Sequence, residues 1–520
     1  MDLENGNAQD LTPFKKIQAR VIGYDKHFPN ELIISMNKDD KRFHDAFHLD
    51  LKSKKLELVA QNPGNVTEWL ADSELMVRAA LAYNPDGGTS LLFRRSAMSE
   101  WVELIKWDFE NEECSLVGFS KDGKKIYLIE SSGSNTKRLV AIEVASKQIS
   151  VIAEDSVYDA DLTMVNPDSY EIEAVRFVKK RADWKAISPE IKTDFEAIKK
   201  IDSGDFKITS RDSSNSKWMI RFERDNGSPS YYLYNRKSKK CDFLFYTRPE
   251  LSDYTLAWME PISFRSRDGL EIHGYLTYPT GKERKNLPLV VHVHGGPWTR
   301  DVWGYDSESQ WLANRGYASL QINYRGSSGY GKKFLNAGNK EWGGKMHDDL
   351  IDGVNWVIKK GIANKKKIAI YGGSYGGYAA LVGATFTPDV FCCAVDIVGP
   401  SNLITDTRSN PPYWAAFLSM WHKRVGNPDT EEDFMKSRSP LFKVDQIKIP
   451  ILIAQGANDP RVNKSESDQI VEAMKKKGIK YKYLIFPDEG HGFAKPKNRM
   501  KFYAVAEKFL AENLGGRFEK

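Results

Sequence analysis

The feature that most constrains the fold is a strand–turn–strand unit that recurs at a nearly constant interval. Its three copies read FHLDLKSKKLELVA, VAIEVASKQISVIA and YYLYNRKSKKCDFLFY, with turns at Ser53, Ser146 and Ser238. The turns are therefore 93 and 92 residues apart. Half of this interval, about 46 residues, is the length of one four-stranded propeller blade. A weaker copy, SLLFRRSAMSEWVELIKWD, lies near the midpoint of the first interval. The repeat favours a β-propeller over an ordinary sandwich with similar hairpins.

The propeller-like texture extends from the start of the sequence to about Leu256. Short runs such as ELIISMN, KIYLIES and WMIRFER are bounded by Asp, Gly, Asn, Ser and Lys, as strands are. A domain at 1–255 has room for about five blades of this length. The stretch LTPFKKIQARVIGYD resembles the end of one blade running into the next. We therefore expect a β-propeller that is short or incomplete, and exposed strand edges that favour a homo-oligomer.

A second domain is predicted over 256–520, because single hydrophobic cores stop growing beyond about 250–300 residues. Buried-type strands such as LPLVVHVHGG, YASLQINYRG and PILIAQGAND alternate here with helical patterns. In HDDLIDGVNWVIKKG, the side chains of Leu350, Val354 and Val357 fall on one helical face. Such alternation is typical of a parallel sheet with crossover helices. The sequence therefore predicts an α/β domain with a mostly parallel, doubly wound sheet.

The composition argues against several classes of protein. Hydrophobic residues make up 41% and aromatic residues 12%, which is typical of globular proteins. A net charge of +6, from 76 basic and 70 acidic residues, predicts no nucleic-acid partner. The apolar runs are far shorter than the roughly 20 residues of a membrane helix, and the polar start MDLENGNAQD is no signal peptide. The cysteines, which form no C-x-x-C motif, predict neither disulfides nor zinc and favour a cytoplasmic location: Cys114, Cys241, Cys392 and Cys393.

The glycine-rich stretch KKKIAIYGGSYGGYAA places one serine at a predicted strand-to-helix turn. Residues 368–371 are expected to form a strand, and a helix is expected from Tyr378 onward. The motif at 372–376 is then G-x-S-x-G in the context of a nucleophile elbow, with Ser374 as the nucleophile. Small flanking residues are needed because side chains there would collide with the neighbouring strand and helix. A plain glycine-rich loop is the alternative, so the partners of the serine decide the interpretation.

A serine nucleophile needs a base, and the base needs an orienting acid. On an α/β-hydrolase fold these follow the serine in the order Asp, then His, on loops after later strands. Asp459 follows the strand in PILIAQGANDPRV, and His491 follows the strand in KYLIFPDEGHGF. Asp488 and Glu489 are rival acids, but they stand too close to His491 in sequence for the usual geometry. We therefore predict Ser374, Asp459 and His491 as the catalytic residues.

The oxyanion of an acyl-transfer intermediate is normally bound by two backbone N–H groups. One should come from Tyr375, the residue after the nucleophile, and the other from Gly296 in the loop VVHVHGGPW. His292 and His294 in the same stretch could suggest a metal ion. They alternate on a buried strand without a third ligand, so we expect them to be packed and hydrogen-bonded instead. No metal and no cofactor is predicted.

Five motifs in this order resemble the prolyl oligopeptidase family of serine peptidases: HGGPW, NYRGSSGYGKKF, GGSYGGYAAL, GANDPRV and FPDEGHGF. The similarity is dense over 260–514 and nearest to the acylaminoacyl peptidase and dipeptidyl aminopeptidase branch. It implies a propeller joined to an α/β-hydrolase domain and hydrolysis of short peptides, with release of acyl-amino acids or dipeptides, or with internal cleavage. It also implies that Arg461 reaches a substrate carbonyl. The first specificity pocket would be lined by Tyr413, Trp414 and Phe417. The family normally has six to eight blades, more than this chain has room for.

Three other functions are compatible with parts of the sequence. The stretch at 326–332 satisfies G-x-x-x-x-G-K of a nucleotide-binding loop, and Asp396 could mimic an acidic strand end. A nucleotide-binding loop requires Ser or Thr next, whereas residue 333 is lysine. A noncatalytic scaffold would be expected to lack one of the three catalytic residues. An esterase or lipase could use the same residues, so only the propeller and Arg461 favour a peptide substrate over an ester.

Overall fold

The computed structural model describes residues 6–111 and 114–519. The chain forms two compact units. The first unit comprises Met1–Phe177, Trp184–Ile191 and Pro411–Trp421. The second comprises Val178–Asp183, Lys192–Asn410 and His422–Lys520. These units do not coincide with the domains proposed at 1–255 and 256–520, because the last antiparallel sheet before residue 256 belongs to the second unit.

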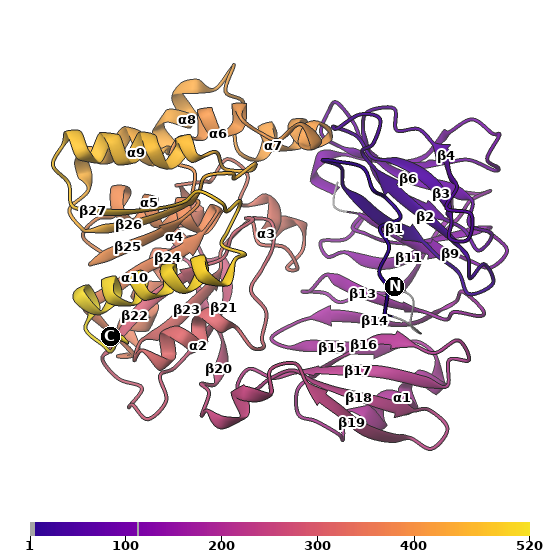
Figure 1. Ribbon diagram of the computed structural model, residues 1–520, viewed down its shortest axis with the longest axis horizontal. Coiled ribbons are helices and arrows are strands. Elements are labelled where there is room, and N and C mark those ends of the chain that lie inside the picture. The colour runs from indigo at the N-terminus through magenta and orange to yellow at the C-terminus, as the bar shows by residue number, and fades with distance from the viewer. Residues whose placement is uncertain (1–5, 112–113, 520) are drawn as a thin grey trace. The chain divides into compact units, whose positions relative to one another are not determined.

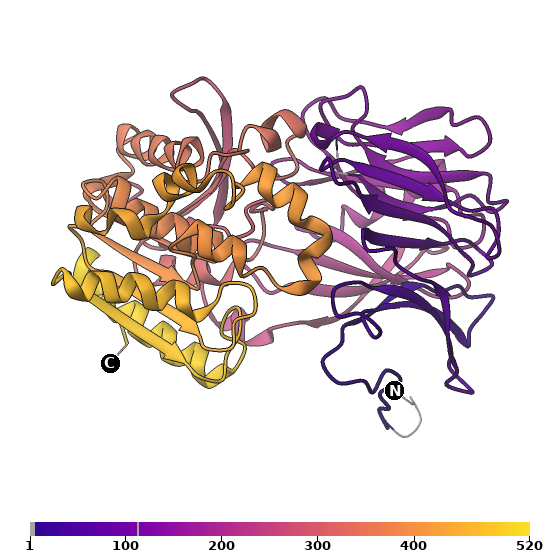
Figure 2. The same cartoon turned by 90° about the horizontal axis from the view of Figure 1, so that it is seen from above.

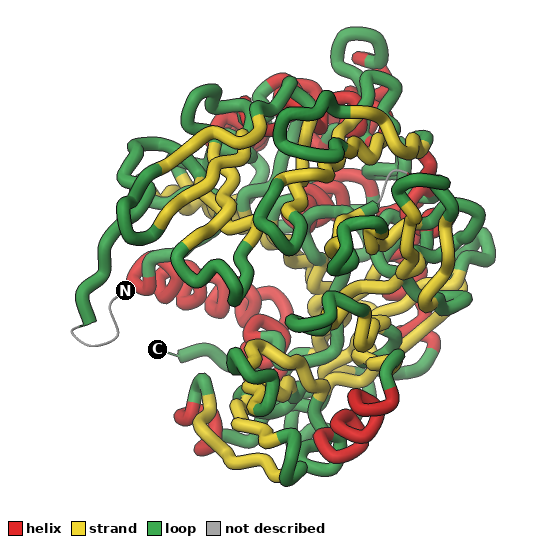
Figure 3. Tube along the Cα trace, turned by 90° about the vertical axis from the view of Figure 1, so that its right-hand side faces the viewer, coloured by secondary structure: helices red, strands yellow, loops and turns green. Residues whose placement is uncertain are grey.

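Five antiparallel sheets precede residue 256 in the described part of the chain, each built only from strands that follow one another in sequence. Their strands and loops can be followed in Figure 3. The first sheet contains β1 (Ala19–Gly23), β2 (Glu31–Met36), β3 (Asp45–Asp50) and β4 (Leu56–Ala60). The second contains β5 (Val66–Ala71), β6 (Val77–Tyr83), β7 (Thr89–Phe93) and β8 (Val102–Trp107). The third contains β9 (Ser115–Phe119), β10 (Lys125–Glu130), β11 (Arg138–Glu143) and β12 (Ile149–Ala153). The fourth contains β13 (Ala160–Val165), β14 (Ile172–Val178) and β15 (Ala182–Ala186), and is followed by α1 (Pro189–Ile198). The fifth contains β16 (Asp205–Arg211), β17 (Lys217–Glu223), β18 (Ser230–Asn235) and β19 (Lys240–Tyr246).

The repeated hairpins are the third and fourth strands of the first, third and fifth sheets, as the repeat predicts. Each of the three turns contains a lysine in the left-handed region: Lys54, Lys147 and Lys239, with φ of 62°, 60° and 57°. The three copies therefore share backbone conformation as well as sequence. The weaker copy forms the third and fourth strands of the second sheet.

The second unit is built on an eight-stranded sheet in the order β20-β21-β23-β22-β24-β25-β26-β27. The strands β20 and β21 run antiparallel to their neighbours, and β22 to β27 are parallel. Their bounds are β20 (Met259–Arg265), β21 (Glu271–Thr277), β22 (Leu287–Val293), β23 (Ala318–Asn323), β24 (Ala363–Gly373), β25 (Cys393–Ile397), β26 (Ile451–Gly456) and β27 (Tyr481–Phe486). The central strands are buried almost throughout, which explains their near-continuous apolar sequences.

Helices cover both faces of this sheet (Figures 1 and 2). On one face, α2 (Ser307–Asn314) and α10 (Pro496–Leu514) share a core with Ala369, Tyr371 and Val395 of the sheet. On the other face, α4 (Lys345–Lys359) and α5 (Tyr375–Phe386) lie so close to the strands that glycines are needed where the helices contact the sheet. A Cβ at Gly353 would lie 2.3 Å from Ile322 Cδ1. The other helices of this part of the chain are α3 (Lys332–Asn336), α6 (Leu403–Arg408), α7 (Leu418–Arg424), α8 (Glu432–Arg438) and α9 (Lys464–Lys476). The 3-10 helices are η1 (Phe109–Asn111), η2 (Pro249–Asp253), η3 (Pro412–Phe417) and η4 (Pro440–Gln446).

The buried side chain of Gln310 in α2 joins the fifth sheet to the eight-stranded sheet within the second unit. Its amide nitrogen donates to the carbonyl of Asp225 at 2.8 Å and to that of Ala257 at 2.7 Å. Its amide oxygen accepts from the N–H of Ala257 at 2.8 Å. One buried carboxamide therefore satisfies three backbone groups in two loops, the one between β17 and β18 and the one that leads into β20.

Among the residues that the structure describes, no helix combines the length and the apolar composition needed to cross a lipid bilayer.

Candidate active site

Ser374 occupies a sharp turn between β24 and α5, at the carboxyl end of the central strand. Its φ of 59° and ψ of −120° lie outside the regions that serine normally adopts. The surrounding glycines allow the turn to pack tightly, since a Cβ at Gly376 would lie only 2.1 Å from Val293 O. The helix begins at Tyr375, so the predicted start at Tyr378 is about one turn too late. A strained serine between a strand and a helix is the geometry of a nucleophile elbow.

His491 bridges Ser374 and Asp459. Its Nε2 lies 3.0 Å from Ser374 Oγ, and its Nδ1 lies 2.7 Å from Asp459 Oδ2. The aspartate follows β26 and is 4% exposed, whereas the histidine follows β27 and is partly buried. The other carboxylate oxygen of Asp459 accepts from the N–H groups of Arg461 at 2.8 Å and Val462 at 3.0 Å. The acid is therefore held in place by its own loop, and both of its oxygens are hydrogen-bonded.

The two rival acids have other partners. Glu489 accepts from the N–H groups of Ala494 at 3.0 Å and Lys495 at 2.9 Å, and so closes the loop that carries His491. Asp488 accepts from the side-chain amide of Asn498 at 2.9 Å. Both carboxylates thus stabilise the start of α10, whereas the histidine ring is bound by Asp459.

The two predicted oxyanion donors come from the residue after Ser374 and from the loop after β22. Tyr375 is the first residue of α5, so its N–H has no carbonyl partner within the helix. The other loop follows β22, and a Cβ at Gly295 would lie 3.3 Å from Ser374 Cβ. Gly296, the next residue, has φ of +113° and precedes a cis proline. The structure therefore brings the glycine loop against the nucleophile, at Gly295 in particular.

His294 is packed and hydrogen-bonded, as the sequence predicts. Its ring stacks on Tyr324 with centroids 4.4 Å apart, and its Nε2 lies 3.0 Å from Ser327 Oγ. Among the described residues, no group of three or more His, Cys, Asp or Glu side chains could hold a metal ion. The histidine therefore supports the glycine loop through packing.

His292 belongs to a buried charged network that the sequence does not predict. Its Nε2 lies 3.0 Å from Glu308, whose carboxylate also accepts from the hydroxyl groups of Tyr371 at 2.8 Å and Tyr503 at 3.1 Å. Burial lowers the pKa of His292, but the hydrogen bond and charge of Glu308 outweigh it and raise this pKa to about 9. His292 and Glu308 therefore form an ion pair at neutral pH. The carboxylate of Glu308 accepts hydrogen bonds from three donors, His292, Tyr371 and Tyr503.

Asp396, at the end of β25, lies beneath the elbow. Its Oδ1 accepts from the N–H of Gly399 at 2.9 Å, and its Oδ2 has no hydrogen-bond partner in the described part of the chain. Burial raises the pKa of this carboxyl to about 8. A Cβ at Gly377 would lie 2.3 Å from Oδ1, so the aspartate and the first turn of α5 are in close contact.

The predicted substrate-binding residues fall into two groups. Arg461 is exposed, and no described residue forms an ion pair with its guanidinium. Tyr413, Trp414 and Phe417 lie in η3, which belongs to the first unit. Within that unit, the ring of Phe417 packs edge-on against Tyr83 with centroids 5.2 Å apart. Their role in a specificity pocket stays a prediction.

A cavity of about 250 Å³ adjoins the serine and the histidine. It is lined by residues around the elbow, of α2, of the loop after β27 and of α10: Gly373, Ser374, Ile397, Val398, Glu308, His491, Gly492, Phe493, Arg499, Phe502 and Tyr503. Neither Tyr375 nor the glycine loop lines it. The cavity therefore lies on the histidine side of the nucleophile, away from the candidate oxyanion donors.

Comparison with known proteins gives a consistent result. The profile of the Prolyl oligopeptidase family matches residues 303–517. Dipeptidyl aminopeptidase BIII of Pseudoxanthomonas mexicana is 44% identical, over 100% of this chain and 77% of that protein. Dipeptidyl peptidase family member 6 of Caenorhabditis elegans is 36% identical, over 93% of this chain and 70% of that protein. A puromycin-hydrolyzing peptidase of Mycobacterium tuberculosis has a similar fold, with a TM-score of 0.73 at 18% identity, over 96% of this chain and 86% of that one. The predicted fold class, a propeller joined to an α/β-hydrolase domain, is confirmed.

Proposed function

This chain belongs to the prolyl oligopeptidase family of serine peptidases, and we propose that it releases dipeptides from the free amino terminus of short peptides. We assign Ser374, Asp459 and His491 as its catalytic triad. The observation that carries this proposal is the bridge that His491 forms between the other two side chains, at 3.0 Å and 2.7 Å. Dipeptide release is favoured over acyl-amino acid release because the two dipeptidyl peptidases match nearly all of this chain.

The first step follows from this geometry. His491 Nε2 accepts the hydroxyl proton of Ser374 as Oγ attacks the scissile carbonyl carbon. The imidazolium that forms is stabilised by the Asp459 carboxylate on Nδ1. The N–H groups of Tyr375 and Gly296 donate to the oxyanion that develops on the carbonyl oxygen.

The second step releases the two products. His491 returns its proton to the nitrogen of the leaving peptide, the C–N bond breaks, and an acyl-enzyme remains on Ser374. Water then gives a proton to His491 and attacks the ester carbonyl. His491 returns that proton to Ser374 Oγ as the acyl C–O bond breaks, and the released dipeptide acid ionises to a carboxylate. Arg461, whose backbone holds Asp459, presents its free guanidinium to a carbonyl of the substrate.

The remaining assignments follow from the sequence. We propose residues 1–255 and 256–520 as the two sequence domains, and Tyr413, Trp414 and Phe417 as part of the first specificity pocket. The four cysteines are free thiols, which suits a reducing cytoplasmic compartment.

The test is labelling with a fluorophosphonate together with turnover of three p-nitroanilides: Ala-Ala, acetyl-Ala and an amino-blocked tripeptide. We expect a single label, at Ser374, and fastest turnover of the free-amino dipeptide. Ser374→Ala should abolish labelling and lower turnover by about 10⁶, as in other triads. Ser96→Ala, at an exposed serine bonded to Ser99, is the matched control and should change neither. Labelling that persists in Ser374→Ala would overturn the triad, and faster turnover of acetyl-Ala would overturn dipeptide release.

A further inference from the structure

The proposed mechanism indicates on which side of the scissile bond the cavity beside Ser374 and His491 lies. His491 protonates the leaving nitrogen, so the leaving part of the peptide must lie next to its Nε2. The cavity is lined by His491 and the two residues after it, and not by Tyr375 or the glycine loop. It therefore lies on the leaving-group side of the scissile bond. This step rests on the proposed function.

The cavity suits a small leaving group. At about 250 Å³ it is smaller than the roughly 300–1,000 Å³ of pockets for drug-sized ligands. Gly373, the residue before Ser374, leaves space in the cavity wall. The nearest atom to a Cβ at this position would be Ile397 O, at 3.9 Å. Phe493, Phe502 and Tyr503 supply an aromatic wall opposite. Such a space accommodates one amino-acid residue.

Two charged side chains line the cavity, and only one of them is compensated. Glu308 accepts from His292, Tyr371 and Tyr503, as described above. Arg499 is exposed, and its guanidinium has no ion-pair partner among the residues that the structure describes. Arg499 is therefore the uncompensated charge among the residues that line the cavity.

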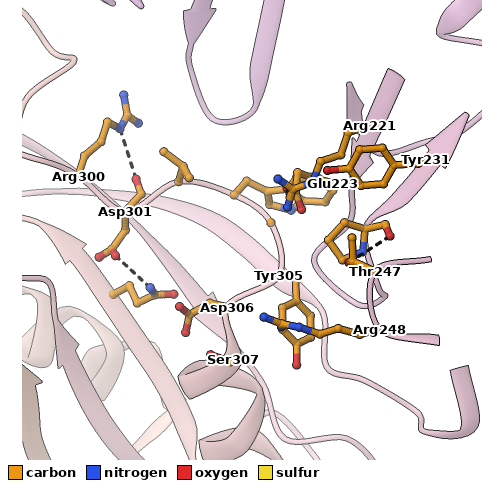
Figure 4. Close-up of a pocket in the computed structure, with 15 residues that line it drawn as sticks. Arg221, Glu223, Tyr231, Thr247, Arg248, Arg300, Asp301, Tyr305, Asp306 and Ser307 are labelled. Atoms are coloured by element: carbon orange, nitrogen blue, oxygen red, sulfur yellow. Dashed lines mark hydrogen bonds and ion pairs between the residues drawn. The ribbon is translucent and has the colours of Figure 1, made fainter. Parts of the chain in front are cut away.

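Two further cavities follow this one, each sharing lining residues with the one before, and the row of three is here called the groove. A second cavity of about 460 Å³ shares Arg499 and Tyr503 with the first. A third, of about 620 Å³, shares Arg248 and Ser307 with the second. Figure 4 shows this third cavity, in which the guanidinium of Arg248 lies over the ring of Tyr305, 5.1 Å from its centroid. A leaving peptide longer than one residue has room to pass Arg499 and follow this groove.

Most other arginines along the groove are already engaged. Arg315 pairs with Glu507 at 2.7 Å, and Arg221 pairs with Glu223. Arg300 donates to the carbonyl of Val178 at 2.8 Å. Among the arginines that line the three cavities, Arg499 is the one that lines the cavity beside Ser374, and it is free to receive an anion from the substrate.

We propose that Arg499 binds the terminal carboxylate of the leaving residue and makes the protein prefer very short peptides with a free carboxyl terminus. A tripeptide places that carboxylate in the cavity beside His491. Each added residue extends a chain by about 3.3–3.6 Å, so the carboxylate of a longer peptide lies beyond Arg499. Arg499 is therefore a specificity-determining residue on the leaving-group side.

The experiment compares pairs of peptides that differ only at the carboxyl terminus: Ala₃ and Ala₃-amide, then the same pairs with four, five and six alanines. The readout is the ratio of kcat/KM for acid over amide. We expect a ratio of about 5–10 for the tripeptides at low salt, a fall toward 1 with length, and a fall with added salt because the site is exposed. In Arg499→Gln the tripeptide ratio should drop to about 1, and Arg499→Lys should restore part of it.

Lys497→Gln is the matched control, since Lys497 is an exposed cation on the same helix and lines none of the three cavities. It should keep the wild-type ratio. A wild-type ratio of 1, or an unchanged ratio in Arg499→Gln, would overturn the inference while leaving peptide turnover intact. If turnover itself fails, calorimetric binding of the two tripeptides to Ser374→Ala gives the same comparison. Equal affinities for acid and amide would then refute the role of Arg499.

Discussion

Replacing Gly376 by alanine should unfold the nucleophile elbow, whereas the same replacement at Gly373 should be tolerated. The two glycines lie on opposite sides of Ser374 in the sequence, and both replacements add the same single methyl group. At Gly376 the added Cβ would lie 2.1 Å from Val293 O and 3.0 Å from Val293 C. At Gly373 the nearest atom, Ile397 O, would be 3.9 Å away.

The expected magnitude follows from what the methyl group meets. Val293 ends β22, which is paired on both sides by β23 and β24, so its carbonyl cannot move without breaking sheet hydrogen bonds. Overpacking costs about 1–3 kcal/mol, and we expect the upper end here because the obstacle is backbone. For a domain of this size, about 3 kcal/mol lowers Tm by about 6–12 °C. Gly373→Ala should instead gain about 0.4–1 kcal/mol, since alanine restricts the unfolded chain.

The assay is thermal unfolding followed by fluorescence, with fluorophosphonate labelling of Ser374 measured on the same samples at 25 °C. Gly376→Ala should melt early and label slowly. Gly373→Ala should melt at or slightly above the wild-type temperature and still label. The steric reasoning is refuted if Gly376→Ala melts within about 2 °C of the wild type, or if Gly373→Ala is equally destabilised.

Three further predictions concern charged groups. Arg461→Ala should lower kcat/KM for peptides about 10- to 150-fold, and for p-nitrophenyl acetate far less, because a hydrogen bond from a charged donor contributes about 1.5–3 kcal/mol; equal losses would make Arg461 structural. Asp459→Asn should lower kcat by about 10⁴ because the histidine would take the wrong tautomer, whereas Glu489→Gln should lower Tm with little change in kcat; the reverse pattern would exchange the two acids. Asp396 keeps its proton in the folded state up to about pH 8 but loses it near pH 4 when unfolded, so its burial makes the free energy of unfolding fall as pH rises between these values. Asp396→Asn should remove up to about 1.4 kcal/mol per pH unit from that slope in denaturant titrations, and Asp389→Asn, at an exposed ion pair with Lys448, should not.

The sequence predicts those elements whose signal is local. The repeated hairpins are found because Ser-Lys turns recur at a fixed spacing, and the turn lysines indeed share one backbone conformation. The order of Ser374, Asp459 and His491 is recognisable because each follows a strand of the parallel sheet, and parallel strands end at one edge of the sheet. The start of α5 is misplaced because glycines weaken helical periodicity, while packing against β22 stabilises the helix.

Other parts depend on contacts between distant segments, which have no local signal. The ion pair of His292 and Glu308 joins a strand to the following helix, and the stretch around His292 carries no signal for its partner. The exposed Arg499 looks like any other cation of an amphipathic helix until the cavity beside it is known. The membership of 411–421 in the first unit is likewise set by packing, as between Phe417 and Tyr83.

The ribosome makes Gln310 later than the segments whose backbone groups it binds. All four strands of the fifth sheet emerge before this residue, yet the connection from Asp225 to Ala257 needs its carboxamide for three hydrogen bonds. At a synthesis rate of about 5–20 residues per second, those backbone groups are hydrogen-bonded to water for several seconds before Gln310 is made. The loops that flank the fifth sheet therefore wait for a later segment of the nascent chain, and they stay open to a protease or chaperone until α2 is made.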